Sequence, residues 1–178
     1  MTQDDAARDS ALITGKALER HFDLEDAMRE FARLFRDDTN DRAMVIVGAA
    51  FIDTQLEHVI ANFLVDDDKE VSALLATYSG KTRLAYCLGL VGPVILEDLR
   101  LIGKIRNTFA HDLYASFSRS DIGSWASSLR WHRMSYMTPP AGSSARDLFN
   151  VGLNQVAAHL SGIVSIARLE KRIIRRNG

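Results

Sequence analysis

Apolar residues recur along much of the chain at the intervals of three, four and seven positions that are typical of amphipathic helices. The longest such pattern predicts a helix over residues 42–65. Its expected buried face consists of Val45, Ile52, Leu56, Val59 and Phe63. Gly48, Ala49 and Ala50 are small enough to let a second helix approach closely.

A second strong pattern predicts a helix over residues 93–110, beside the first in the middle of the fold. Pro93 suits the first helical position, because its fixed φ matches the helix and no backbone donor is needed there. The expected buried face consists of Ile95, Leu99, Ile102 and Phe109. The expected solvent face consists of Glu97, Arg100, Lys104 and Asn107.

Together with weaker signals elsewhere, these patterns predict an all-α fold. We expect a single-domain helical bundle of about six or seven helices over residues 22–176. A partly disordered arm is expected over residues 1–21. A helix is expected from Asp23 through Phe35, a short one after residues 66–68, and one capped by Ser79. A closing helix is expected over residues 146–176, after a loop at residues 138–144 that contains two prolines and a glycine.

Composition narrows the class of protein. The 178 residues are 47% hydrophobic and 25% charged, which are ordinary values for a globular protein. The net charge of −1 gives no general attraction to nucleic acid, and no apolar run reaches the length of a membrane span. We therefore expect a soluble, cytoplasmic protein with no membrane association, no metal site and no cofactor. The single cysteine, Cys87, excludes an intramolecular disulfide and is expected in the core.

Arg106 is the most unusual position in this pattern. It lies four residues after Ile102 and three before Phe109, so the spacing places it within the apolar stripe. A guanidinium keeps its charge, and burying it requires a carboxylate, a phosphate or a wet interface. Asp53 and Glu57, four residues apart on the neighbouring helix, are the expected partners.

His111 follows Arg106 by five residues, and two interpretations stay open. On an unbroken helix this step turns about 140°, so the two side chains would not share a face. They would converge if the helix ended near Ala110, or if a second copy of the chain supplied the partner. In that case Arg106, Asn107 and His111 form a candidate catalytic set. Otherwise Arg106 is a salt-bridge residue and His111 a cation at a helix C-terminus.

The run Ser79-Gly80-Lys81-Thr82 superficially suggests a phosphate-binding loop. The first glycine of that motif is missing and no strand precedes it, so we reject this interpretation. Lys81 and Arg83 near the start of a helix remain candidates for binding an anion.

The segment Arg106-Asn107-Thr108-Phe109-Ala110-His111 resembles the arginine–polar–x3–histidine motif of the HEPN superfamily. A longer resemblance, over residues 41–113, is to the mannitol operon repressor (MtlR) family. It is carried by Asp41-Arg42 with Gly48-Ala49-Ala50, by residues 81–90 (KTRLAYCLGL), and by residues 98–102 (DLRLI).

The two resemblances imply different functions. The MtlR resemblance implies a transcriptional regulator, and the near-neutral charge leads us to expect action through a protein partner, with direct DNA binding disfavoured. The HEPN resemblance implies a metal-independent endoribonuclease, active as a homodimer on RNA. His111 would then be the general base, Arg106 would stabilise the charged phosphorane, and Asn107 would orient the phosphate or the histidine.

Overall fold

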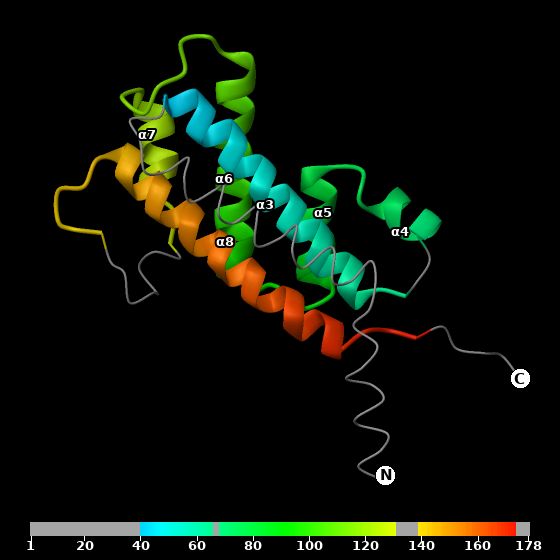
Figure 1. Cartoon of the computed structure of the whole chain (residues 1–178). Helices are drawn as coiled ribbons and strands as arrows, with labels where there is room; N and C mark the ends of the chain where they lie inside the picture. The colour runs from blue at the N-terminus through cyan, green and yellow to red at the C-terminus, as the bar shows by residue number, and fades with distance from the viewer. Residues whose placement is uncertain (1–39, 66–67, 131–138, 174–178) are drawn as a thin grey trace, which may run out of the picture. The chain divides into compact units, whose positions relative to one another are not determined.

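The computed structural model describes residues 40–65, 68–130 and 139–173. Within these ranges it contains six α-helices and no strand, which confirms the predicted all-α bundle (Figure 1). The helices are α3 (Asp41–Phe63), α4 (Asp68–Leu74), α5 (Tyr78–Cys87), α6 (Pro93–His111), α7 (Ser120–Ser127) and α8 (Ala145–Leu169). The predicted arm over residues 1–21 and the predicted helix from Asp23 through Phe35 lie outside the described residues, as do residues 131–138.

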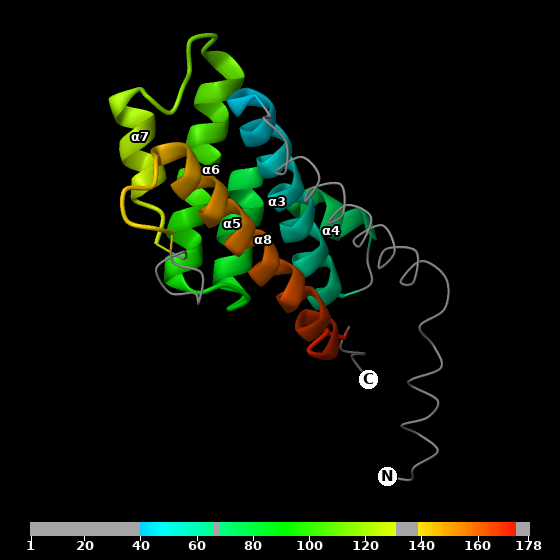
Figure 2. The same cartoon turned by 60° about the vertical axis from the view of Figure 1, so that its left-hand side comes forward.

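Helix α3 occupies the middle of the bundle and contacts α5, α6 and α8. It lies beside α8, and the two helices run in the same direction (Figures 1 and 2). At their starts Arg146 Nε lies 2.7 Å from Asp41 Oδ1, and at their ends the Arg172 amide donates to the Phe63 carbonyl over 2.8 Å. By length and composition α3 could also cross a membrane, but more than half of that stretch is buried, as in the core helix of a bundle.

Helix α6 runs antiparallel to α3, so that the end of α6 meets the start of α3. The Arg42 guanidinium donates hydrogen bonds to the carbonyls of Phe109, Asp112 and Leu113, the last two over 2.8 and 2.9 Å. At the end of a helix the last carbonyls have no later helical amide to donate to them, and Arg42 bonds carbonyls of this kind. Arg42 therefore ties the turn after α6 to the central helix.

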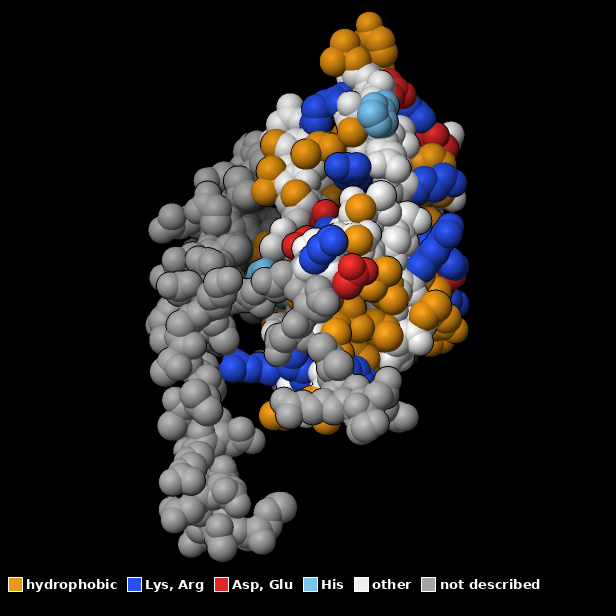
Figure 3. Space-filling model, turned by 90° about the vertical axis from the view of Figure 1, so that its right-hand side faces the viewer, with side chains coloured by type: hydrophobic (Ala, Val, Ile, Leu, Met, Phe, Trp, Pro, Cys, Tyr) orange, Lys and Arg blue, Asp and Glu red, His pale blue; other side chains and the backbone are white. Residues whose placement is uncertain are grey.

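A charged cluster orders the loop between α6 and α7. Arg119 pairs with Asp112 and, over 2.6 Å, with Asp121. The Arg119 hydrogen bond holds the pKa of Asp121 at about 2, and the Tyr114 amide together with Arg119 lowers the pKa of Asp112. This loop carries two exposed apolar side chains, Leu113 and Tyr114, and apolar side chains gather where it lies at the top of the face in Figure 3.

The predicted helix starts are close to the observed ones, with local corrections. Pro93 is the first residue of α6, as expected, and α8 begins with a capping box between Ser144 and Asp147. Helix α5 is capped by Thr77, so the prediction of Ser79 as the cap was wrong by two residues. Its Thr77 Oγ1 accepts from the Gly80 amide over 3.0 Å, a bond that the hydroxyl of Ser79, inside the first turn, does not make.

Two further predictions were wrong. Cys87 is exposed, because the buried face of α5 runs through Lys81, Thr82 and Ala85, and a residue two positions beyond Ala85 points the other way. Helix α8 ends at Leu169 and not at residue 176, because the chain leaves the helix at Glu170 and the Arg172 amide bonds across to α3.

Candidate functional site

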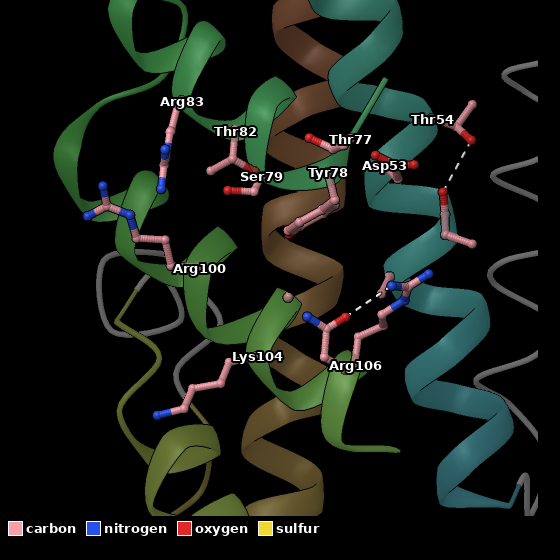
Figure 4. A pocket seen from close by; sticks show the side chains of 14 residues that line it. Asp53, Thr54, Thr77, Tyr78, Ser79, Thr82, Arg83, Arg100, Lys104 and Arg106 are labelled. Carbon is pink, nitrogen blue, oxygen red and sulfur yellow. Dashed lines mark hydrogen bonds between the residues drawn. The ribbon is translucent and has the colours of Figure 1, made fainter. Parts of the chain in front are cut away.

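A cleft of about 800 Å³ opens between α3, α5 and α6 (Figure 4). Three helices from separate parts of the sequence contribute to it, together with the turn that caps α5. Its lining residues are Ala49, Ala50, Asp53, Thr54, Thr77, Tyr78, Ser79, Thr82, Arg83, Arg100, Gly103, Lys104, Arg106 and Asn107. This volume lies within the range of pockets that hold small organic molecules.

Tyr78 and Gly103 form a tightly packed part of the lining. The Tyr78 hydroxyl donates to the Leu99 carbonyl of α6 over 2.8 Å, and burial raises the pKa of this hydroxyl far above its usual value. A Cβ atom on Gly103 would lie 2.7 Å from Cε1 of the same ring. Tyr78 therefore stays neutral and fixed in place, and glycine at position 103 lets α5 and α6 approach closely.

Gly103→Ala is expected to destabilise the protein by about 1 kcal/mol. Alanine gains about 1 kcal/mol of helix propensity, but overpacking against a ring held by its own hydrogen bond costs about 1–3 kcal/mol. The measurement is the free energy of unfolding in urea. The matched control is Gly162→Ala in α8, where the new Cβ meets nothing within 4 Å and stabilisation of about 0.5–1 kcal/mol is expected. Equal stabilisation by both changes would contradict the packing.

Asp53 and Glu57 bind Lys81, and the prediction that they neutralise Arg106 was wrong. Lys81 Nζ lies 2.8 Å from Asp53 Oδ1 and 3.1 Å from Glu57 Oε2. The Lys81 side chain is only 6% exposed, whereas the two carboxylates are 37% and 52% exposed. Burial by itself would lower the pKa of Lys81, but both carboxylates outweigh it and the pKa is raised. Lys81 does not line the cleft, so its predicted role at an anion site is not supported by this geometry.

Arg106 is exposed, and its predicted place within the apolar stripe was wrong. The buried face of α6 passes through Ile102, Ile105 and Phe109, at intervals of three and four residues. Arg106 follows Ile105 by one residue, and this step of about 100° rotates it off the buried face. Its Nη1 donates to Asn107 Oδ1 over 3.0 Å, and its side chain extends toward α3 along one side of the cleft (Figure 4).

His111 is the last residue of α6, exposed and outside the cleft lining. The helix is unbroken from Arg106 to His111, so the step between them turns about 140°. Within one chain the structure therefore brings Arg106 and Asn107 to the cleft but does not bring His111 there. His111 does lie in the last turn of α6, the position that the sequence predicted for it.

Arg100 and Lys104 line the cleft, although the sequence predicted only that they meet solvent. Arg100 Nη1 lies 2.5 Å from Glu97 Oε1, and Lys104 Nζ lies 3.9 Å from the centre of the Trp125 ring. Thr77 and Tyr78 were also missed. Helical periodicity identifies the exposed face of α6 but does not predict that α5 packs beside that face. Because α5 does so, the exposed face of α6 becomes one wall of a cleft.

The described residues contain no group of three His, Cys, Asp or Glu side chains that could hold a metal ion. Comparisons with protein-family models, with curated proteins and with solved structures found no match to this chain.

Proposed function

We propose that this protein is a non-enzymatic regulator of transcription that binds a small ligand in the cleft and acts through a protein partner. The observation that carries the proposal is the cleft itself: it has the size of a small-molecule site and a charged, hydroxyl-rich lining from three helices. A ligand that contacts α3, α5 and α6 together favours one arrangement of these helices. Binding can thereby change the surface of this protein that a protein partner contacts.

The position of His111 supports a binding role over catalysis within one chain. A general base must come within hydrogen-bond reach of the proton that it removes, and the group that stabilises the charge must face the same phosphate. Arg106 and Asn107 line the cleft whereas His111 does not. The net charge of −1 likewise favours output through a protein over direct DNA binding. We propose that this regulator acts in the cytoplasm.

Deleting the gene is expected to change the transcript levels of a small set of genes, and the wild-type chain is expected to restore them. Arg106→Gln, which removes a charge from the cleft, is expected to restore them only in part. Arg168→Gln is the matched control, because it removes an exposed charge from the end of α8, outside the cleft.

Purified protein should retain no particular fragment from a genomic DNA pool at physiological salt. Unchanged transcripts, or selective DNA retention, would overturn the proposal.

A second function, a dimeric endoribonuclease, is favoured by one specific observation. Arg106, Asn107 and His111 are all exposed on α6, so a second copy of the chain facing this helix would bring two sets of these residues together. Sedimentation of the purified protein tests the homodimer, and a monomer at high concentration would exclude this arrangement.

Under the regulator proposal, purified protein is expected to leave a labelled RNA pool intact in the presence of a chelator, just as a His111→Ala variant does. Cleavage by the wild-type protein alone, with both proteins folded, would establish the ribonuclease instead. Cleavage by both proteins would indicate a contaminating nuclease, and a further purification step before the assay separates that case.

A further inference from the structure

We propose that the cleft binds a small polar molecule through its phosphate monoester group, held between Arg83 of α5 and Arg100 of α6. The inference rests on the proposed function of the cleft as a ligand site, and it names the chemical class of the ligand.

The arrangement of the two arginines is the first argument. Arg83 and Arg100 come from neighbouring helices, and their side chains point toward one another at one edge of the cleft (Figure 4). Guanidinium groups do not lose their protons, so two of them that point toward one another repel each other. A dianion between them replaces this repulsion with two attractions. The planar fork of each guanidinium also matches phosphate oxygens with paired N–H donors.

The donors needed for this contact remain available. Arg100 uses Nη1 for Glu97, and the pair is at the surface, with side chains 54% and 49% exposed. A guanidinium has five N–H donors, so this pairing leaves several for a ligand. Arg83 is exposed and forms no ion pair with another described residue.

The charge balance of the lining selects an anion. Three lining arginines, Arg83, Arg100 and Arg106, face one lining carboxylate, Asp53, while the ammonium of the fourth cation, Lys104, lies over the Trp125 ring of α7. Asp53 is already paired with Lys81, which is not a lining residue. The cleft is thus locally positive in a chain whose net charge is −1. A concave site lined by one sign of charge concentrates ligands of the opposite sign.

The rest of the lining suits a small polar body. Hydroxyl groups of Ser79 and Thr77 lie between the two arginines and α3, and α3 itself contributes the hydroxyl of Thr54 to the lining (Figure 4). The Thr77 hydroxyl accepts from the Gly80 amide and the Thr54 hydroxyl donates to the Ala50 carbonyl, so each has hydrogen-bonding capacity left. A ligand with hydroxyl or amide groups beside its phosphate can exchange hydrogen bonds with this wall.

The test uses the full-length protein and glycerol 3-phosphate as the probe, with calorimetric titration at constant ionic strength. Saturable binding is expected, glycerol at the same concentrations should not bind, and inorganic phosphate should bind more weakly. Arg83→Gln and Arg100→Gln are each expected to weaken binding about tenfold or more, since each removes a charge and its paired N–H donors from the phosphate. Arg168→Gln, an equal loss of charge on α8 outside the cleft, is expected to leave binding unchanged.

Each outcome bears on the proposal. No saturable binding of glycerol 3-phosphate or phosphate overturns it, and so does an equal weakening in all three variants, which would indicate unspecific attraction to charge. Tight binding of RNA that displaces the probe would assign the cleft to a polyanion and overturn the small-molecule class. Circular dichroism and melting temperature confirm that these surface variants fold.

Transcript changes that persist without probe binding would refute this inference alone, whereas binding without transcript changes would refute the proposed function alone.

Discussion

The double variant Asp53→Asn/Glu57→Gln is expected to lose about 3 kcal/mol of its free energy of unfolding. Both changes preserve side-chain size but remove the charges that face Lys81 Nζ at 2.8 and 3.1 Å. Breaking a buried ion pair costs about 3–5 kcal/mol, because the remaining charge is left without compensation. We take the lower end, because both carboxylates are partly exposed, at 37% and 52%, and because the amides that replace them can still accept hydrogen bonds from the ammonium group.

Adding Lys81→Met to this double variant is expected to recover most of the loss, because an apolar chain of similar length removes the uncompensated charge. Urea unfolding of the wild-type, double and triple variants measures the coupling. Glu97→Gln is the matched control: it removes a carboxylate from the exposed pair with Arg100 and should cost no more than about 0.5 kcal/mol. If the double variant is as stable as this control, the two carboxylates do not stabilise the buried charge of Lys81.

The same ion pairs predict how stability depends on pH. The pKa of Lys81 is raised in the folded protein, so its contribution is fully present below the unfolded value of 10.5 and is lost as pH rises through the folded pKa. The wild-type protein should therefore lose stability above about pH 10.5. The triple variant, which lacks the lysine, should lose less over the same pH range.

Phe149→Ala is expected to cost about 3–5 kcal/mol, the usual range for removing a fully buried phenylalanine. Phe149 packs against Phe117 with ring centres 5.3 Å apart, and Phe117 packs at the same distance against Phe109. This row of rings joins α8, the loop after α6, and α6 itself. Its loss should leave a cavity at the point where three segments meet.

Tyr114→Ala is the matched control for this prediction, since it truncates an aromatic side chain that is 84% exposed on the same loop. Its cost should stay within about 0.5 kcal/mol. Urea unfolding measures both variants. A loss below about 1 kcal/mol for Phe149→Ala would mean that the rings do not form a shared core.

Most of the fold could be predicted from the sequence, because the elements that matter are long and strongly periodic. Pro93 and the apolar series from Ile95 to Phe109 define α6 almost to the residue. The start of α8 was predicted to within one residue from the loop at residues 138–144, and the capping box of Ser144 and Asp147 fixes it at Ala145. Such signals are local, since each depends on residues within one or two turns. The end of α8 depends on a contact with α3 and was misplaced.

The candidate site was predicted less well, because its residues are distant in sequence and on faces that the pattern describes only as exposed. Arg83 was predicted as an anion-binding residue and does line the cleft, but Arg100 and Lys104 were not singled out. Lys81 was predicted to bind an anion near the start of a helix and is instead buried against two carboxylates of α3. No spacing rule within a single helix identifies a partner on another helix.

The sequence by itself determined the helical class, the positions of the main helices and most of their buried faces, because helical periodicity and capping are short-range effects. Only the tertiary structure decided the partner of each charge. It assigned Asp53 and Glu57 to Lys81, turned Arg106 toward α3 and left His111 outside the cleft. The physical reason is that an ion pair depends on a few ångströms between side chains, and those distances are set by how whole helices pack.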